Sequence, residues 1–300
     1  MGGLLARRGA AQGPRLWDGA IGSELIALGL DLSVEPPEAW SLSRPDVVQA
    51  LHQRYLAAGA EVIQTNTFGA SRPRLVTARL DAQLDRLNRA AVALARASGA
   101  RLVVASLGPT GIDPFGGEAA VLIEAAYAEQ ITALAAAGVD GLHAETMCHP
   151  IEAVAFLGAA HAVAPRLPTI VSTTVALGDF GFQTPWAIPL ARMAAACEEA
   201  GAGALGINCS LEARKLLGAV RALREQTELP ILVQPQGGEP AIGCRGESKG
   251  DTPERFAAGC LKLIEAGADA VGGCCGAGPD YLAVLARAIR ESVAAMQHAP

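Results

Sequence analysis

The sequence predicts a (β/α)8 barrel, and three observations lead to that prediction. Four times an alanine-rich segment ends in Ala-Gly and runs directly into an apolar stretch, at Gly59, Gly138, Gly201 and Gly267. Glycine is the usual cap after a helix, so each joint is typical of a helix that leads into a strand. Eight apolar runs alternate with segments of helical spacing. Finally, a chain that is 51% hydrophobic and only 18% charged suits a sheet buried on both faces.

The predicted strands are short apolar runs, most of them followed by small or polar residues. They cover residues 15–19, 61–66, 102–108, 141–146, 169–175, 204–209, 231–236 and 270–275. The predicted helices between them have apolar residues at helical spacing and cover 45–58, 81–98, 119–137, 151–164, 190–200, 211–227 and 253–266. No long polar linker interrupts this order, so we expect one domain over residues 1–300 with a short flexible start at about 1–13. A doubly wound open sheet is the alternative.

Charge and cysteine content exclude several classes of protein. The formal net charge is −6 and no basic block occurs, which argues against nucleic acid or an anionic membrane as a partner. The sequence contains no run of 18 apolar residues, so no transmembrane helix is expected. Arg7 and Arg8 are not followed by an apolar stretch, so no secretory signal is expected. Seven cysteines in such a chain indicate metal or thiol chemistry in the reducing cytoplasm rather than disulfides. Oligomeric state stays open.

Three cysteines stand at the ends of two predicted strands. Cys274 and Cys275 follow the last strand and are flanked by glycine, and Cys209 ends the sixth. The carboxyl ends of barrel strands meet at one face, so these thiols can share one ion. Three thiolates with an open fourth position are typical of a catalytic zinc site. The alternative is that all three are buried and act as small apolar residues.

Such a site favours one kind of chemistry. Zinc held by three thiolates carries a net negative charge, so it polarises carbonyl groups poorly. It is better suited to binding a substrate thiol as thiolate, which is the nucleophilic form of a group with a free pKa near 8.5.

Small or polar residues end the other predicted strands and form a candidate substrate site: Asp18, Gly19, Asn66, Gly108 and Glu145. Two of these have plain alternatives, since Glu145 could cap the next helix and Asp18-Gly19 is also a turn signal.

His143 is expected to face the helices and His149 to lie in a loop, both in structural roles. Cys148 is expected near the mouth of the barrel as a thiol without an assigned role. No sequence pattern pairs Cys197, Cys244 or Cys260 with another metal ligand or cysteine. Aromatic residues in the loops could form a wall against a methylated cation: Trp40, Phe68, Phe115, Phe180, Phe182 and Trp186.

The chain resembles the zinc-dependent homocysteine S-methyltransferases from about residue 16 to residue 290. The motifs that carry the resemblance are 18–25 (DGAIGSEL), 64–71 (QTNTFGAS), 108–111 (GPTG), 145–146 (ET), 206–209 (GINC) and 272–276 (GGCCG). Some of these are similar to betaine–homocysteine methyltransferase and others to the homocysteine module of cobalamin-dependent methionine synthase. After the seventh strand the chain reads Pro235-Gln236-Gly237-Gly238, where the synthase module has Pro-Asn-Ala-Gly, so the fourth zinc ligand without substrate stays open.

The resemblance implies a (β/α)8 barrel in which Cys209, Cys274 and Cys275 hold Zn²⁺ and the sulfur of homocysteine completes the coordination. It also implies that Glu145 and Asp18, with the backbone at Gly19, hold the amino-acid end of homocysteine.

Three hypotheses about function follow. The first is a cytoplasmic methyltransferase that makes methionine from homocysteine and a small donor such as betaine or a methylsulfonium compound. The second is a homocysteine- and zinc-binding acceptor module, active only with a separate methyl-corrinoid protein. The third is a barrel lyase whose cysteines merely lie near the site. The identity of the methyl donor, and the choice between homocysteine and related thiols or selenols, stay open.

Overall fold

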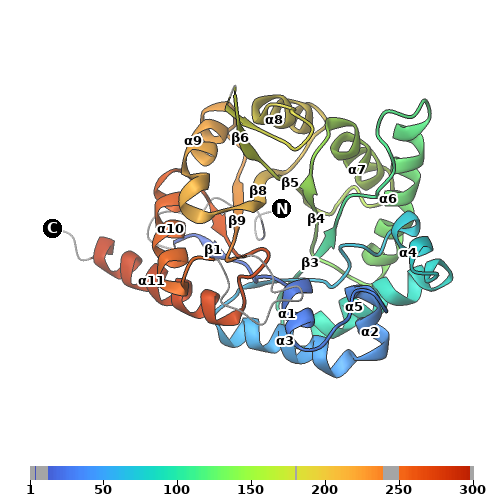
Figure 1. Ribbon diagram of the computed structural model, residues 1–300, viewed down its shortest axis with the longest axis horizontal. Helices are drawn as coiled ribbons and strands as arrows, with labels where there is room; N and C mark the ends of the chain where they lie inside the picture. Colours follow the sequence, from blue (N-terminus) through green and yellow to red (C-terminus); the bar gives the residue numbers. More distant parts are fainter. Residues whose placement is uncertain (1–3, 5–12, 180, 239–249, 298–300) are drawn as a thin grey trace.

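Eight parallel strands form a closed barrel with helices around it (Figure 1), which confirms the predicted fold class. The computed structural model describes residues 4, 13–179, 181–238 and 250–297. The barrel strands, in their spatial order, are β1 (Arg15–Leu16), β10 (Ala270–Val271), β9 (Ile231–Gln236), β8 (Ala204–Glu212), β5 (Thr169–Thr173), β4 (Gly141–Met147), β3 (Leu102–Leu107) and β2 (Val62–Gln64). A parallel bridge between Trp17 and Val62 joins the two ends of this order, so the sheet closes.

Helices follow the strands around the outside. They are α1 (Gly22–Ala27), α2 (Trp40–Ser43), α3 (Pro45–Ala57), α4 (Arg72–Thr77), α5 (Leu84–Ala97), α6 (Ala119–Ala136), α7 (Pro150–Val163), α8 (Leu190–Glu199), α9 (Leu217–Gln226), α10 (Pro253–Glu265) and α11 (Pro279–Gln297), with the short 3-10 turns η1 (Pro37–Ala39), η2 (Asp81–Gln83) and η3 (Ala213–Leu216). The hairpin of β6 (Ala176–Gly178) and β7 (Gly181–Gln183) is inserted between β5 and α8.

The four Ala-Gly joints end helices as predicted. Gly59, Gly138, Gly201 and Gly267 have φ between +83° and +112°, which side chains rarely adopt. Each follows α3, α6, α8 or α10, and a barrel strand begins within three residues. The joints therefore set where each unit of the barrel turns back toward the sheet.

The core has two layers. Most buried residues lie between the strands and the helices, and a smaller cluster fills the barrel interior, with Trp17, Val62, Val104, Ile170, Ala204 and Leu232 on the strands or directly after them. Leu4 joins this interior cluster and is itself buried. The rest of the predicted flexible start, apart from Gly13, lies outside the described residues.

Some element bounds differ from the prediction. The strands predicted at 15–19 and 270–275 end at Leu16 and Val271. The chain leaves the ladder there because Gly273 donates its N–H to the carbonyl of Asp18, at 2.9 Å, outside the regular strand pattern. The predicted helix at 211–227 begins later, since β8 continues to Glu212. The β6–β7 hairpin was not predicted.

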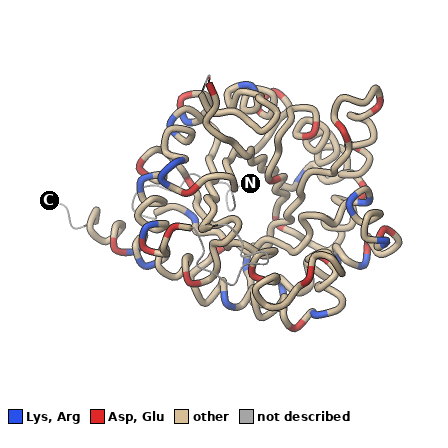
Figure 2. Tube along the Cα trace, in the orientation of Figure 1, with Lys and Arg blue, Asp and Glu red and all other residues tan. Residues whose placement is uncertain are grey.

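One described helix, α6, has the length and apolar composition to cross a membrane. It is flanked by α5 and α7 in the outer ring, and 44% of its residues are buried within the protein. Length and composition alone are weak support for a membrane span, since a core-facing barrel helix has both. Charged residues lie mainly on the outer helices and loops, with both signs mixed (Figure 2).

Candidate functional site

A cavity of about 280 Å³ opens at the carboxyl ends of the barrel strands. The ends of β2, β3, β4, β8 and β9 line it, together with the turns after β1 and β10 and the η1 segment. It contains all three cysteines singled out from the sequence, and Glu145 lies in its wall. The structure therefore brings the predicted metal ligands and the predicted substrate carboxylate into one space.

The sulfur atoms of Cys209, Cys274 and Cys275 all lie within 4.8 Å of one another. The Cys209 and Cys275 sulfurs are 3.7 Å apart. A tetrahedral zinc with Zn–S bonds of about 2.3 Å requires sulfurs roughly 3.8 Å apart. Thiolates are ligands that zinc prefers, and three of them leave one position of the tetrahedron for another ligand. The donor set thus fits a catalytic zinc site.

The three thiols share protons when no metal holds them. Hydrogen bonds with Cys274 and Cys275 lower the pKa of Cys209 to about 3, while the bond to Cys209 raises the pKa of Cys275 to about 11 and contributes to raising that of Cys274 well above its usual range. The cluster is therefore arranged to hold negative charge on Cys209 first. A metal ion would replace the protons of the other two.

Backbone strain is concentrated at this end of the barrel. Cys209, Ser210 and Thr146 have φ of 62°, 57° and 63°, in the left-handed region that is unfavourable for side chains and especially for a β-branched residue. The strand registers shift at the same places, between Ala144 and Met147 and between Asn208 and Glu212. The irregularity turns the side chains of Glu145 and Cys209 into the cavity lining.

Glu145 is held by two neighbours. Gln64 Nε2 donates to its Oε1 at 2.8 Å, and the hydroxyl of Ser106 donates to the same oxygen. Burial raises the pKa of Glu145 to about 7, although these two hydrogen bonds act in the opposite direction. The predicted helix cap is not its role, because both partners lie on barrel strands. A carboxylate in this place can accept hydrogen bonds from a cationic group in the cavity.

Gln64 connects Glu145 to the barrel interior. Its Oε1 accepts from Gln234 Nε2 at 2.6 Å, and its Nε2 lies 3.2 Å from His143 Nδ1. His143 in turn contacts Ser172 Oγ at 2.7 Å and packs edge-on against Trp17. The prediction that His143 faces the helices is wrong. Successive side chains along β4 point alternately to the helices and to the barrel interior, and His143 is one of those that point to the interior.

Gly19 is part of the cavity lining, and the preceding residue, Asp18, is not. The Asp18 side chain is fully buried, its Oδ2 accepts the N–H of Gln64 at 2.8 Å, and its Oδ1 has no partner among the described residues. Burial raises the pKa of Asp18 well above its usual range. Gly19 lines the cavity, and a Cβ there would lie 2.2 Å from the carbonyl of Ala277. Only glycine allows the turn after β1 to approach the cysteine turn so closely.

Asn66 and Gly108 shape the wall of the cavity. Asn66 lines it, but its Nδ2 donates to the carbonyl of Pro37 at 2.7 Å and so holds the η1 segment in place. Gly108 does not line the cavity. A Cβ there would lie 2.6 Å from the ring of Phe68, which does line it. Gly108 thus provides room for an aromatic wall.

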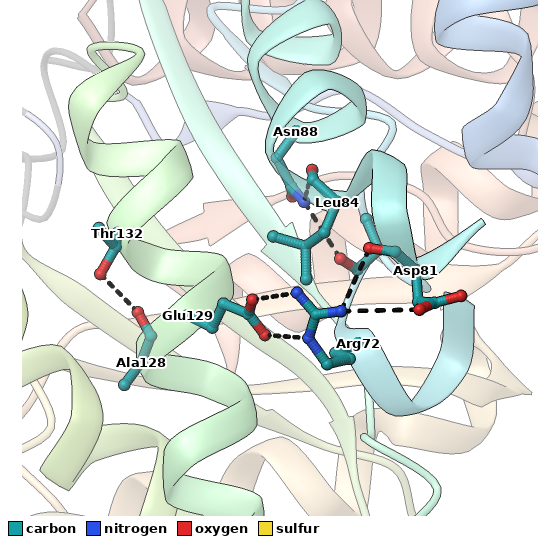
Figure 3. Close-up of polar contacts among 8 residues, drawn as sticks. Arg72, Asp81, Leu84, Asn88, Ala128, Glu129 and Thr132 are labelled. Carbon is teal, nitrogen blue, oxygen red and sulfur yellow. Dashed lines mark hydrogen bonds and ion pairs between the residues drawn. The ribbon is translucent and has the colours of Figure 1, made fainter. Parts of the chain in front are cut away.

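The outer side of this wall is anchored to two helices. Arg72, at the start of α4, forms a paired interaction with Glu129 of α6 and reaches Asp81 of η2, as Figure 3 shows. Asn88 of α5 donates to the carbonyls of Ala70 and Leu84, at 3.1 and 2.9 Å. These contacts fix the segment that follows β2.

The predicted aromatic wall is only partly assembled. Phe115 and Trp186 form a cluster with His149, with ring centroids 5.1 to 6.2 Å apart, while Trp40 is buried and donates to Glu35. Phe182 packs against Gly218 instead.

His149 accepts from Ile151 N at the start of α7. Among the other predicted positions, Cys148 bonds to the carbonyl of Thr146, Cys197 and Cys260 are buried, and Phe180 and Cys244 lie outside the described residues.

Four residues of the site were not assigned roles from the sequence: Gln64, Ser106, Asn208 and Gln234. Each stands at a predicted strand end, so its position was visible. Its partner was not, because every contact crosses from one strand to another.

Comparisons with known proteins agree with this geometry. The sequence model described as "Homocysteine S-methyltransferase" matches residues 15–289. The metallated form of the homocysteine methyltransferase MmuM from Escherichia coli superposes with a TM-score of 0.78 at 26% identity, covering 92% of this chain and 96% of that one. Its oxidised form superposes with a TM-score of 0.75, covering 93% and 99%.

Two longer curated relatives are also similar. The methionine synthases of Mycobacterium leprae and Mycobacterium tuberculosis are 28% identical to this chain over 299 and 292 residues. These matches cover 93% and 91% of the chain but only 24% of each relative. The chain therefore spans about a quarter of the length of these curated relatives.

Proposed function

The chain belongs to the homocysteine S-methyltransferase family, and from this premise we propose that it transfers a methyl group to the thiol of homocysteine, giving methionine. One observation supports the proposal most directly: a cluster of three cysteine sulfurs and the carboxylate of Glu145 line the same cavity. Homocysteine carries a thiol at one end and the ammonium and carboxylate groups of an amino acid at the other. The cavity offers a matching partner for the thiol and for the ammonium group.

Glu145 would orient the ammonium group. Because Gln64 and Ser106 both bond to Oε1, that oxygen is fixed and Oε2 has only a long contact, 3.5 Å, from Asn208. Asp18 would act indirectly, because it accepts the N–H of Gln64 and so holds the residue that positions Glu145. The backbone at Gly19 would form the wall beside the amino-acid end of the substrate. Asn66 and Gly108 would contribute by holding the wall in shape.

Cys209, Cys274 and Cys275 would hold zinc. When bound there, zinc would bind the substrate sulfur as a thiolate, the nucleophilic form of the thiol. The protein's part is to place that sulfur, through Glu145 and the cavity wall, in line with the donor methyl group. In this proposal the transfer needs no general base, because zinc would take the place of the thiol proton. The substrate sulfur gains a bond to the methyl carbon while the donor keeps the electron pair of its broken bond.

A second candidate function is supported by the comparison of lengths. Since the chain corresponds to about a quarter of the curated methionine synthases, it could serve as an acceptor module. It would then hold zinc and homocysteine and receive the methyl group only from a separate methyl-corrinoid protein. We further propose that the chain is one domain and that it acts in the cytoplasm.

Metal analysis and a donor screen test these proposals together. Purified protein should contain about one zinc per chain, and Cys209→Ala or Cys274→Ala should lose it, whereas Cys197→Ala, a buried cysteine outside the site, should keep it. Methionine should form from homocysteine with betaine, S-methylmethionine or S-adenosylmethionine as donor. Methionine formation only after addition of a methyl-corrinoid protein would favour the acceptor module. Full zinc retention in both site variants would refute the site assignment.

A further inference from the structure

Glu38 is a buried carboxylate in the cavity wall that the transfer described above does not use. It belongs to η1, its side chain is 5% exposed, and it lines the same cavity as the three cysteines. Its Oε1 accepts the N–H of Gly69 at 2.6 Å. The backbone N–H of Glu38 itself also stabilises the carboxylate, but no side chain of the described residues donates a hydrogen bond to Oε2, and this atom is not among the buried polar atoms without a partner. One carboxylate oxygen is thus fixed by the backbone and the other is available to a ligand.

No protein cation pairs with this carboxylate among the described residues. Arg74 is close enough to lower the pKa of Glu38, but it forms no ion pair with it, and burial raises the pKa more strongly. A buried carboxylate without a charged partner is costly for the fold, and an incoming cation offsets that cost. None of the described lining residues of the cavity is Lys, Arg or His. The described lining therefore offers negative but no positive side-chain charge to a ligand.

Glu38 is also placed beside an apolar surface. Gly69, which it contacts, follows Phe68, and the ring of Phe68 lines the cavity. Methyl groups on a positively charged sulfur or nitrogen carry part of the charge and pack well against an aromatic face. A carboxylate next to such a face matches the two surfaces of an onium group.

We propose that Glu38 is the residue that recognises the positive charge of an onium methyl donor, a sulfonium or a quaternary ammonium compound. The inference rests on the proposed methyl transfer and adds a specificity-determining residue to it. During transfer the bond between the onium atom and the methyl carbon breaks, its electron pair stays on the donor, and that atom becomes neutral. Glu38 therefore attracts the donor more strongly than the transition state or the product.

This asymmetry gives a kinetic signature. An interaction that is stronger in the ground state than in the transition state lowers KM without raising kcat. Glu38→Gln keeps an oxygen for the N–H of Gly69 and removes the charge. It should raise the donor KM about tenfold or more, leave kcat unchanged or slightly raised, and leave the Kd of homocysteine within about twofold.

Glu38→Asp separates charge recognition from a purely structural role. It keeps the charge but shortens the reach to Gly69. If Glu38 recognises charge, Glu38→Asp should bind the donor better than Glu38→Gln does. If its only role is to hold Gly69, the order should be reversed. Glu35→Gln is the matched control, because Glu35 lies in the same segment, bonds to Trp40 and does not line the cavity.

The experiment uses zinc-loaded full-length protein with homocysteine, and with S-methylmethionine, betaine or methylcobalamin as donor. Turnover with either onium donor and the expected order of the three variants supports the inference, and the donor that works identifies a sulfonium or an ammonium. An unchanged donor KM in Glu38→Gln overturns it while the methyl transfer stands. Wild-type turnover with methylcobalamin alone also overturns it. Failure of wild-type protein to bind zinc and homocysteine refutes the proposed function itself.

Discussion

Asn208 holds Thr146 by two hydrogen bonds across the end of the barrel. Its Oδ1 accepts the backbone N–H of Thr146 at 2.8 Å, and its Nδ2 donates to the Thr146 hydroxyl at 2.9 Å. The two residues lie on β8 and β4, which are separated in the sheet by β5. Each is adjacent to a site residue, Cys209 or Glu145. The pair therefore fixes the distance between the metal end and the carboxylate end of the cavity.

Asn208→Ala should damage the site as well as the fold. The change removes the hydrogen-bond partner of the partly buried N–H of Thr146, together with the two bonds that hold Thr146 at its strained φ of 63°. We expect a loss of about 1–3 kcal/mol in the free energy of unfolding. We also expect weaker zinc binding, because Cys209 has the same strain and loses its neighbour's support. Denaturant unfolding and competition with a metal chelator measure the two effects.

Asn88→Ala provides the comparison. Asn88 is equally buried and donates two hydrogen bonds, both to main-chain carbonyls, but it lies in α5, behind the wall. It should cost similar stability and leave zinc affinity unchanged. Equal loss of zinc affinity in both variants would show that Asn208 acts only through general stability.

The barrel could be predicted from the sequence because its signals are local and repeated. The four Ala-Gly joints show where helices end, and each strand is a nearly continuous apolar run. The β6–β7 hairpin could not be predicted in the same way. It is only three residues on each side, and its residues are exposed or half-buried, so no hydrophobic pattern marks it.

The cluster of three cysteines could be predicted from the sequence, whereas the hydrogen bonds that support the site could not. Cys274 and Cys275 are adjacent and flanked by glycine, which is a strong local signal for metal binding. The hydrogen bonds from Gln64 and Ser106 to Glu145 join residues 81 and 39 positions apart. Such pairings depend on which way each strand faces, and a single residue of register decides that. His143 was misplaced for the same reason.

Gly19→Ala should displace the cysteine turn. The new Cβ would lie 2.2 Å from the carbonyl oxygen of Ala277 and 3.0 Å from Tyr55 Cε1, so backbone must move. Overpacking of this kind costs about 1–3 kcal/mol. Because Ala277 follows Cys275 by two residues, zinc affinity should fall too. Gly117→Ala is the control, since nothing lies within 4 Å of a Cβ there. Thermal unfolding with and without added zinc should separate the variants, and an unaffected Gly19→Ala would contradict the close packing.

His52 contributes to stability at neutral pH, and this contribution should be lost in mild acid. Both ring nitrogens are buried in α3 without a hydrogen-bond partner among the described residues, and burial lowers the pKa of His52 to about 4. In the unfolded chain the pKa is near 6.5, so the unfolded state binds the proton first as pH falls. The stabilising contribution is complete above about pH 6.5, declines between about pH 6.5 and 4, and is lost below that range. The loss is on the order of 3 kcal/mol.

His52→Leu removes this dependence with little change in volume. It should be at least as stable as wild type at pH 7, and its free energy of unfolding should decline less between pH 6.5 and 4. The slope that remains combines two opposing groups. Burial lowers the pKa of His143 to about 3, which adds a decline, whereas burial raises the pKa of Glu145 to about 7, so the folded state binds that proton first and gains stability as pH falls. His161→Gln changes an exposed histidine and should follow wild type. Urea unfolding at several pH values gives the slopes, and identical slopes for wild type and His52→Leu would refute the assignment.

Homocysteine binding should release protons if its sulfur enters the site as a thiolate. Calorimetry at pH 8, in buffers of different ionisation enthalpy, separates this release from other sources. Glu145, with its pKa of about 7, is already largely ionised there, while about three quarters of a free thiol with a pKa near 8.5 is still protonated. The zinc-loaded protein should therefore release close to three quarters of a proton per homocysteine bound. The release should shrink as pH rises through 8.5, because the thiol then arrives ionised.

Two variants separate the two ends of the substrate. Cys275→Ala should abolish the release if it empties the metal site. Glu145→Gln should instead weaken homocysteine binding by about 1.5–3 kcal/mol, because it removes the charge that faces the ammonium group, and should keep the release at saturation. Both results follow only if the sulfur and the ammonium group are held by separate parts of the cavity. Binding at pH 8 with no proton released would mean that the thiol does not reach the site as thiolate, and the proposed transfer would have to be abandoned.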